Sequence, residues 1–257
     1  MPRRVLRFAA HLVTTTAATR ELEELAEAVQ APVTTGRRIA VISVRGGAGR
    51  STVTALLGSV FAARRADHVL VADADPDHGS LSWRLGLHES ESLRVLAPRL
   101  LALRGGIAEL DTILARTPAG LRLLPGADGA PPGTTRELTR GLSRFFAVCV
   151  TDCGRGLENP ATADVLQDAH AAVLATPATP DGVRGTRLGL GRMPPALRAR
   201  VVVALCTIDR GGRAALAPPA AREGLAGTGA PIVTLPYVRH LAAATPIVPG
   251  RIAEATT

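Results

Sequence analysis

The sequence predicts an α/β protein with a mostly parallel β-sheet, helices on both of its faces and a helical N-terminal extension. From residue 37 onward, short and continuously apolar runs alternate with segments of helix length. Apolar runs of this kind are typical of strands that are buried on both faces. Strands that alternate with helices indicate parallel pairing. The expected strands are residues 37–44, 68–75, 121–126, 146–152, 170–177, 199–206 and 231–237.

Composition and charge narrow the class of protein. The 257 residues are 46% hydrophobic, which is enough to bury a full core. Aromatic residues make up only 2% of the chain, which argues against recognition of single-stranded nucleic acid by stacking. The net charge of +8 permits binding to DNA or an anionic surface, but the arginines are scattered as on an ordinary solvated surface. No apolar run approaches the ~18 residues of a membrane span, so we expect a cytoplasmic protein.

The N-terminal segment has a helical pattern of its own. Residues 19–30, TRELEELAEAVQ, begin with a plausible N-cap and carry glutamates in the first turn. The helix should stop before Pro32. We therefore expect residues 1–36 to form a helical extension that packs on the core or on a partner, and residues 37–257 to form one α/β domain.

A glycine-rich loop follows the first expected strand. Residues 44–52 read VRGGAGRST, and the next helix, STVTALLGSVFAARR, begins near Ser51. Gly46, Gly47 and Gly49 fall in the turn, where glycine lets main-chain N–H groups approach a phosphate closely. A strand, a glycine loop and a helix in this order predict a phosphate-binding loop. Val44 stands where an ordinary P-loop has glycine.

Cationic and acidic side chains accompany this loop. The chain contains no lysine, so Arg45 and Arg50 stand where a phosphate loop is expected to have lysine. Asp73 and Asp75 close the second expected strand, and Asp152 closes the fourth. Carboxyl ends of parallel strands meet at one edge of the sheet, where ligands bind in this architecture. The alternatives are a solvated acidic turn for the first pair and a helix N-cap for Asp152.

These motifs resemble those of the MinD/ParA-like ATPases, a class with a deviant Walker A loop of the form KGGxGK[ST]T. The stretch VRGGAGRSTVTALLGSVFA is similar to that loop, with both lysines replaced by arginine. HVLVADADPDHGSLSWRLGL and FAVCVTDCGRGLENPAT resemble the second and third motifs, and the likeness covers most of residues 37–248. The N-terminal extension, SLRVLAPRLLALRGG and the element at residues 236–241 are most like the MinD-like proteins of actinobacterial type VII (ESX) secretion.

The resemblance implies a P-loop NTPase-like domain that binds ATP and Mg²⁺, with a role for each matched residue. Asp75 would orient the attacking water, Arg50 would bridge the β- and γ-phosphates, and Arg45 would reach the nucleotide of a partner in a homodimer. The implied nucleotide-binding residues are Gly46, Gly47, Ala48, Gly49, Arg50, Ser51, Thr52 and Pro236. The implied metal ligands are Ser51, Asp73 and Asp152.

The two arginines decide what function is expected. A guanidinium keeps the charge of lysine but is planar and longer, so it cannot simply occupy the same pocket. We therefore expect an ATP-dependent dimerising switch in secretion, positioning or partitioning, with weak or impaired hydrolysis. One alternative is a catalytically degenerate pseudo-ATPase scaffold for a secretion or partition complex. Another is a partition protein that binds DNA nonspecifically. Base specificity is open, because residues 204–206 lack the asparagine amide by which family members read adenine.

Overall fold

The computed structural model describes residues 20, 23–75, 79–88, 90–126, 130–209 and 215–248. It contains one seven-stranded sheet in the order β3-β2-β4-β1-β5-β6-β7, and every neighbouring pair is parallel, so the predicted fold class is confirmed. Each strand falls within or beside a stretch expected from the sequence. The strands are β1 (Arg37–Ser43), β2 (Val69–Ala74), β3 (Arg122–Leu124), β4 (Val148–Cys153), β5 (Ala171–Pro177), β6 (Val201–Cys206) and β7 (Ile232–Leu235).

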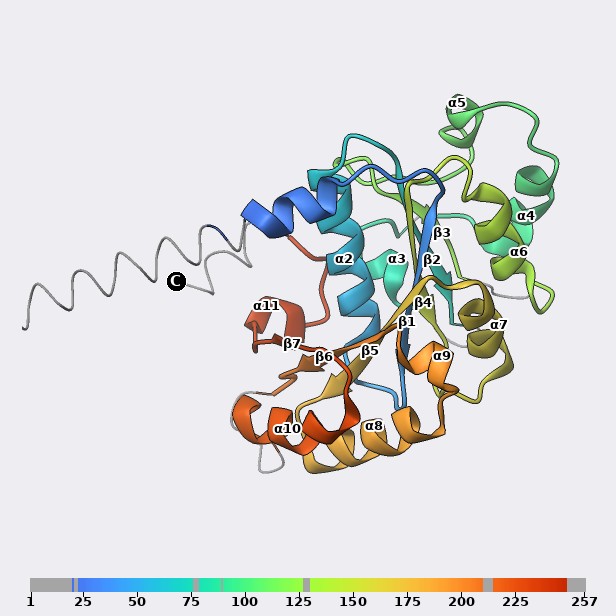
Figure 1. Cartoon of the computed structure of the whole chain (residues 1–257). Helices are drawn as coiled ribbons and strands as arrows, with labels where there is room; N and C mark the ends of the chain where they lie inside the picture. The colour runs from blue at the N-terminus through green and yellow to red at the C-terminus, as the bar shows by residue number, and fades with distance from the viewer. Residues whose placement is uncertain are drawn as a thin grey trace, which may run out of the picture.

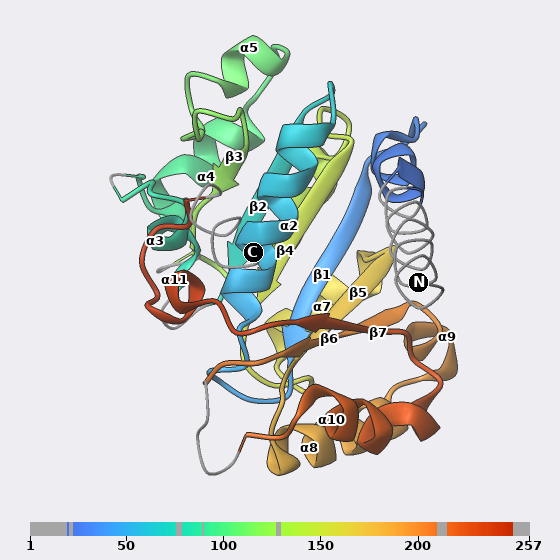
Figure 2. The ribbon, with the colours of Figure 1, turned by 90° about the vertical axis from the view of Figure 1, so that its left-hand side faces the viewer.

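Helices cover both faces of the sheet and join successive strands (Figures 1 and 2). No helix among the described residues has the length and apolar character needed to cross a membrane. The longer helices are α2 (Arg50–Arg64), α4 (Leu93–Leu101), α6 (Thr134–Leu142), α7 (Pro160–Asp168), α8 (Pro180–Arg192) and α10 (Pro218–Leu225). The short ones are α3 (Leu81–Arg84), α5 (Ile107–Leu110), α9 (Pro195–Arg198), the 3₁₀ turn η1 (Ala226–Thr228) and α11 (Arg239–Ala242).

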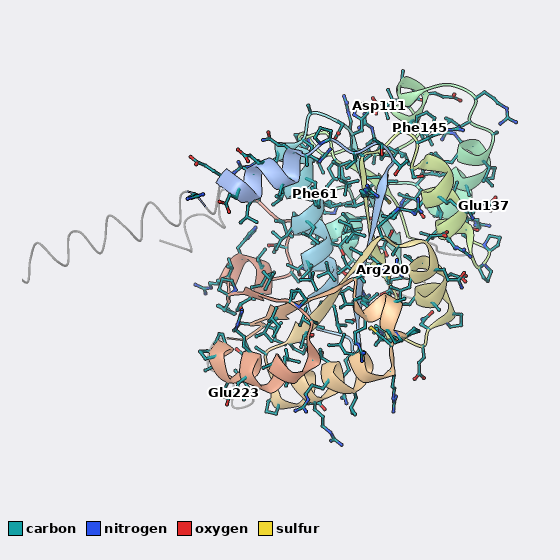
Figure 3. The ribbon with its side chains drawn as sticks, viewed as in Figure 1. Phe61, Asp111, Glu137, Phe145, Arg200 and Glu223 are labelled. Atoms are coloured by element: carbon teal, nitrogen blue, oxygen red, sulfur yellow. The ribbon has the colours of Figure 1, made fainter. Side chains whose placement is uncertain are left out.

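Alternation along the strands assigns side chains to the two faces. Val71 of β2 and Val150 of β4 are register partners and pack in one cluster with Val53 of α2, so α2 covers their face. The neighbouring Leu70 and Ala72 point to the other face and pack in a cluster with residues of α4 and α6. Side chains fill the space between the layers, while charged ones such as Glu137 and Glu223 lie on the outer surface (Figure 3).

An arginine at the end of α2 holds the N-terminal segment. Residues 23–30 are helical, as the sequence predicts. The guanidinium of Arg65 donates to the carbonyl oxygens of Val29 and Ala31, at 2.5 and 3.0 Å. Asp67 pairs with the same guanidinium and fixes its orientation, with Nε–Oδ1 at 2.7 Å. The described part of the extension therefore docks on the core; that residues 1–36 form a separate unit stays a prediction.

Replacing Arg65 with alanine should release this segment without unfolding the core. Two carbonyl contacts are lost, each contributing about 1.5–3 kcal/mol when the donor is charged. We expect backbone hydrogen exchange over residues 23–31 to become at least ~10-fold faster, while exchange in the β-sheet stays unchanged. The matched control is Arg64→Ala, one residue away and exposed. Equal exchange in the Arg65→Ala variant and the wild type would show that other contacts hold the helix.

Candidate functional site

The glycine loop lies between the carboxyl end of β1 and the N-terminus of α2, as the sequence predicts. Gly47 and Gly49 have φ angles of 73° and 89°, in the left-handed region that side chains disfavour. Gly49 is the N-cap of α2, and its carbonyl accepts the N–H of Val53 at 2.9 Å. The loop therefore places main-chain N–H groups at the positive end of a helix, which suits an anion.

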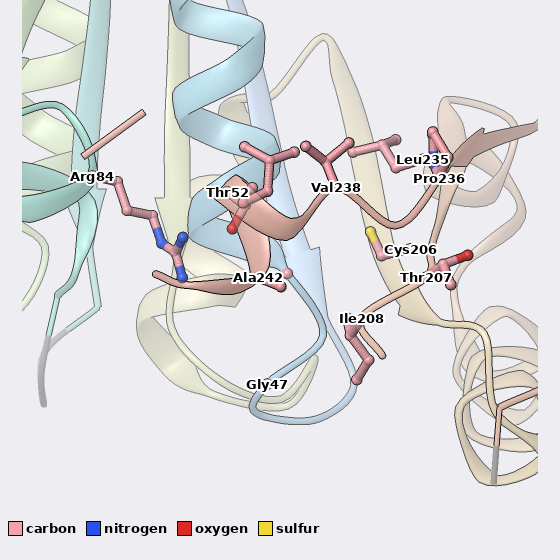
Figure 4. A pocket seen from close by; sticks show the side chains of 12 residues that line it. Gly47, Thr52, Arg84, Cys206, Thr207, Ile208, Leu235, Pro236, Val238 and Ala242 are labelled. Atoms are coloured by element: carbon pink, nitrogen blue, oxygen red, sulfur yellow. The ribbon is translucent and has the colours of Figure 1, made fainter. Parts of the chain in front are cut away.

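Two hollows meet at this loop. The larger, about 340 Å³, is lined by residues 43 and 45–51 together with Asp75, Ser80, Arg84 and Arg155. The smaller, about 190 Å³, runs from Gly47 and Gly49 past Thr52 to the ends of β6 and β7 and to α11, with Pro236 in its wall (Figure 4). The structure thus brings every predicted nucleotide-binding residue to one of two adjoining hollows. Their size and polarity suit a phosphate chain in the first and a base in the second.

Two buried carboxylates lie beneath the loop. Asp73 of β2 and Asp152 of β4 are register partners, so both project toward the face that α2 covers. They are 1% and 0% exposed, and each has a second carboxylate oxygen (Oδ2) without a hydrogen-bond partner among the described residues. Burial, together with the charge of Asp152, raises the pKa of Asp73 to about 7. Burial also raises the pKa of Asp152, although Arg50 opposes this effect. Such a pair requires a cation.

Arg50 supplies that cation. Its Nε donates to Asp152 at 2.7 Å and its Nη2 to Asp75 at 2.5 Å, while Nη1 lies 3.4 Å from the hydroxyl of Ser43. Only 8% of Arg50 is exposed. Burial alone would lower the pKa of Arg50, but the charge and hydrogen bond of Asp152 and the charge of Asp75 together raise it. The guanidinium therefore faces the carboxylates below the loop.

A divalent cation does not fit beside this guanidinium. Mg²⁺ prefers octahedral coordination by oxygen at about 2.0–2.1 Å. The Oδ1 atom of Asp152, a predicted metal ligand, already accepts a hydrogen bond from Arg50, and the side chain of Asp152 is fully buried. Among the described residues no group of three acidic, histidine or cysteine side chains is placed to hold a metal ion. That Ser51, Asp73 and Asp152 bind Mg²⁺ stays a prediction, and it requires Arg50 to move.

The second motif arginine is arranged differently. Arg45 lies on the open side of the larger hollow, where its Nη1 pairs with Asp181 of α8 at 2.8 Å. The two side chains are 62% and 58% exposed. An exposed pair of this kind contributes ~0–1 kcal/mol, so Arg45 can be released to another anion at little cost.

Three further side chains at the hollows were not selected from the sequence. Arg84 lines both hollows and Arg155 lines the larger one. Thr207, which follows β6, lines the smaller hollow with a buried hydroxyl that has no partner among the described residues. It offers a hydroxyl close to where the sequence lacks the family's asparagine. Arg84 is one of many arginines in the chain, and no spacing rule distinguishes it from the others.

The chain is similar in sequence to a secretion-associated protein. No family model matches it. It is 32% identical over 181 residues to the ESX-1 secretion-associated protein EspI of Mycobacterium tuberculosis, in strains CDC 1551 and H37Rv alike. The match covers 65% of this chain but 26% of the relative. The chain therefore spans about a quarter of the curated relatives that it matches.

Similar solved structures are ParA and MinD proteins. A ParA family ATPase from Chlorobium tepidum has a TM-score of 0.66 at 20% identity, with 82% of this chain and 90% of that chain covered. MinD from Pyrococcus furiosus has a TM-score of 0.63 at 25% identity, with 82% and 89% covered. MinD from Pyrococcus horikoshii, solved with Mg-ADP, has a TM-score of 0.63 at 23% identity, with 82% and 87% covered.

The fold and the position of the glycine loop agree with the similarity to MinD and ParA proteins. The glycine loop lies between β1 and α2, and Arg45 in the loop and Arg50 at the start of α2 stand where the sequence motif is expected to have lysine. The chain has the P-loop NTPase fold of the MinD and ParA ATPases, with arginine at both positions of the glycine loop where lysine is expected, and over 181 residues it is similar to a protein associated with ESX-1 secretion.

Proposed function

We propose that this chain is a nucleotide-binding component of a secretion system, in which ATP joins two copies and hydrolysis is weak or absent. The conformation of Gly47 and Gly49 supports nucleotide binding, because it leaves main-chain amides open to the larger hollow. The similarity to EspI supports the link with secretion, although the chain spans a quarter of that protein. The MinD complex with Mg-ADP supports ATP as the nucleotide class.

The salt bridge between Arg50 and Asp75 is the observation that carries the hydrolysis part of the proposal. Phosphoryl transfer depends on cations that surround the γ-phosphate and on a residue that orients the attacking water. Here the predicted cation and the predicted water-orienting carboxylate are bound to each other. Each charge neutralises the other, so neither is available for the transition state. Misplacement by about 1 Å can reduce a rate by on the order of 10²-fold.

The exposed position of Arg45 supports assembly of two copies on ATP. Its pairing with Asp181 is weak enough for a phosphate of a partner's nucleotide to compete. Light scattering should therefore report a dimer with ATP and a monomer with ADP or without nucleotide. Arg45→Ala should abolish the dimer while leaving ATP affinity within ~3-fold. A dimer that persists in Arg45→Ala would contradict this assignment of Arg45.

A degenerate scaffold is the second candidate, and the burial of Arg50 favours it. A cation held internally between Asp75 and Asp152 gives a closed charge network that needs no ligand. In that case oligomeric state and partner binding would be the same with ATP, with ADP and without nucleotide. Nonspecific DNA binding stays a prediction from the net charge of +8, and a steep loss of DNA affinity with rising salt would support it.

Single-turnover hydrolysis of radiolabelled ATP tests the proposal. With enzyme in excess over ATP and with Mg²⁺ present, we expect binding to saturate and less than one tenth of the ATP to be hydrolysed within an hour. Conversion of most of the bound ATP within minutes would contradict impaired hydrolysis. Failure of ATP, ADP and inorganic tripolyphosphate to bind at millimolar concentration would contradict the nucleotide site itself.

A further inference from the structure

Arg84 is held at the junction of the two hollows by contacts of its own backbone and of its neighbour. Its N–H donates to the carbonyl of Ser80 at 3.1 Å, and its carbonyl accepts the N–H of Ile247 at 2.7 Å. The adjacent Trp83 donates its indole N–H to the carbonyl of Ala244 at 2.8 Å. The short helix α3 is thus fixed to the segment that follows α11. These contacts fix the backbone position from which the side chain of Arg84 extends.

Two of the three guanidinium nitrogens of the half-buried Arg84 are buried without partners among the described residues. Its Nε and Nη1 atoms are shielded from solvent and have no hydrogen-bond partner among the described residues. Burial lowers the pKa of Arg84, and the charge of Asp152 opposes this effect only in part. Leaving a charged donor buried and unpaired costs free energy, about 1–3 kcal/mol or more for each donor. A bound anion that accepts hydrogen bonds from Nε and Nη1 of Arg84 would remove this cost.

The location of Arg84 identifies the kind of anion. It lines the larger hollow together with the glycine loop, and it also lines the smaller hollow that leads to Thr52 and Pro236. Figure 4 shows its side chain extending from α3 toward Thr52. A phosphate chain that is seated on the loop amides and leads to a base in the smaller hollow would pass this guanidinium. Arginine donors match phosphate oxygens well in geometry and charge.

The other arginines of the motif do not offer the same contact. Both guanidinium edges of Arg50 are engaged by Asp75 and Asp152, and Arg45 pairs with Asp181 at the open side. On the basis of the proposed nucleotide site, we propose that Arg84 is a phosphate-binding residue that contacts the phosphate chain of a bound nucleoside di- or triphosphate. It thereby supplies the cationic contact that Arg50, turned toward the carboxylates, does not supply.

Calorimetric titration of the full chain with ADP, ATP and adenosine tests this assignment. Arg84→Met keeps much of the side-chain length without the charge, and Arg187→Met on the exposed surface of α8 is the matched control. We expect Arg84→Met to weaken ADP and ATP binding at least ~10-fold and to leave adenosine binding unchanged. Arg187→Met should stay within ~2-fold of the wild type for all three. ADP and ATP affinities within ~2-fold in Arg84→Met would overturn the proposal.

Thermal unfolding separates ligand binding from a structural role. Removing a buried charge without partners should leave the Tm of the free protein equal or higher, while the rise in Tm caused by ADP should shrink. A lower Tm of the free protein, with the rise caused by ADP intact, would mean that Arg84 serves the fold and would overturn the proposal. Rapid ATP hydrolysis by the wild type would contradict impaired hydrolysis but would leave the assignment of Arg84 intact. A wild type that binds neither ADP nor ATP would contradict both.

Discussion

Replacing Arg50 with alanine is expected to lower the free energy of unfolding by about 3–5 kcal/mol. Removal of one partner from a buried ion pair leaves an uncompensated charge, and that is the costly case. Here one guanidinium serves two carboxylates, Asp75 and Asp152, whose side chains are 10% and 0% exposed. Urea unfolding at pH 8, followed by circular dichroism, measures the change.

The size of this effect should depend on pH. Without Arg50, burial and the charge of Asp75 raise the pKa of Asp152 with only the hydrogen bond of Ser51 to oppose them, so this carboxyl takes up a proton in the folded state at a higher pH than in the unfolded state. The folded variant then binds more protons than the unfolded chain, and its stability rises as the pH falls. At pH 5 we therefore expect a smaller loss than at pH 8. Arg45→Ala is the control, because its exposed pair with Asp181 should change stability by ~0–1 kcal/mol at either pH.

Replacing both Arg45 and Arg50 with lysine is expected to increase the rate of ATP hydrolysis by on the order of 10²-fold. A misplacement of a catalytic group by about 1 Å can cost that much, and lysine would correct it. A lysine at position 50 has a compact ammonium on a shorter side chain and lacks the planar fork whose separate nitrogens hold Asp75 and Asp152. The two carboxylates are then held less firmly and can bind water or metal. The ammonium can also reach the phosphates from the loop.

Single-turnover assays of the Arg45→Lys/Arg50→Lys variant measure this gain. Arg64→Lys, at the exposed end of α2, controls for the chemical change alone and should match the wild type. If the double variant binds ATP but hydrolyses it no faster than the wild type, the guanidinium of Arg50 is not what limits hydrolysis.

The positions of the strands and of the loop could be predicted because they depend on local pattern. Continuous apolar runs such as β2 can be buried on both faces only in a covered parallel sheet. Gly47 and Gly49 stand where the chain must adopt left-handed φ angles between a strand and a helix. The short run that forms β3 was expected for the same reason. The fold class therefore agrees with the sequence, and the glycine loop lies where the sequence predicts it.

The direction in which Arg50 points could not be predicted in the same way. The sequence places a cationic side chain next to a phosphate loop. Which anionic group pairs with that side chain depends on the residues that the fold brings close to it. Asp75 and Asp152 are 25 and 102 residues away along the chain. The fold places Asp152 of β4 and Asp75, just after β2, within reach of Arg50, and these two carboxylates hold its guanidinium. Arg84 could not be selected from the sequence for a related reason. What marks it is two buried donors without partners among the described residues, and only tertiary packing creates such donors.

The dependence of ATP affinity on magnesium tests the central claim most directly, because the claim concerns which cation the carboxylates hold. If the guanidinium of Arg50 stays between Asp75 and Asp152, Mg²⁺ gains neither of these two carboxylates as a ligand when ATP binds. Calorimetry of the wild type should then give Kd values for ATP that differ by less than ~3-fold between excess Mg²⁺ and excess EDTA. Binding at least ~100-fold tighter with Mg²⁺ than with EDTA would contradict the claim, because it would mean that the metal displaces Arg50 and occupies the site.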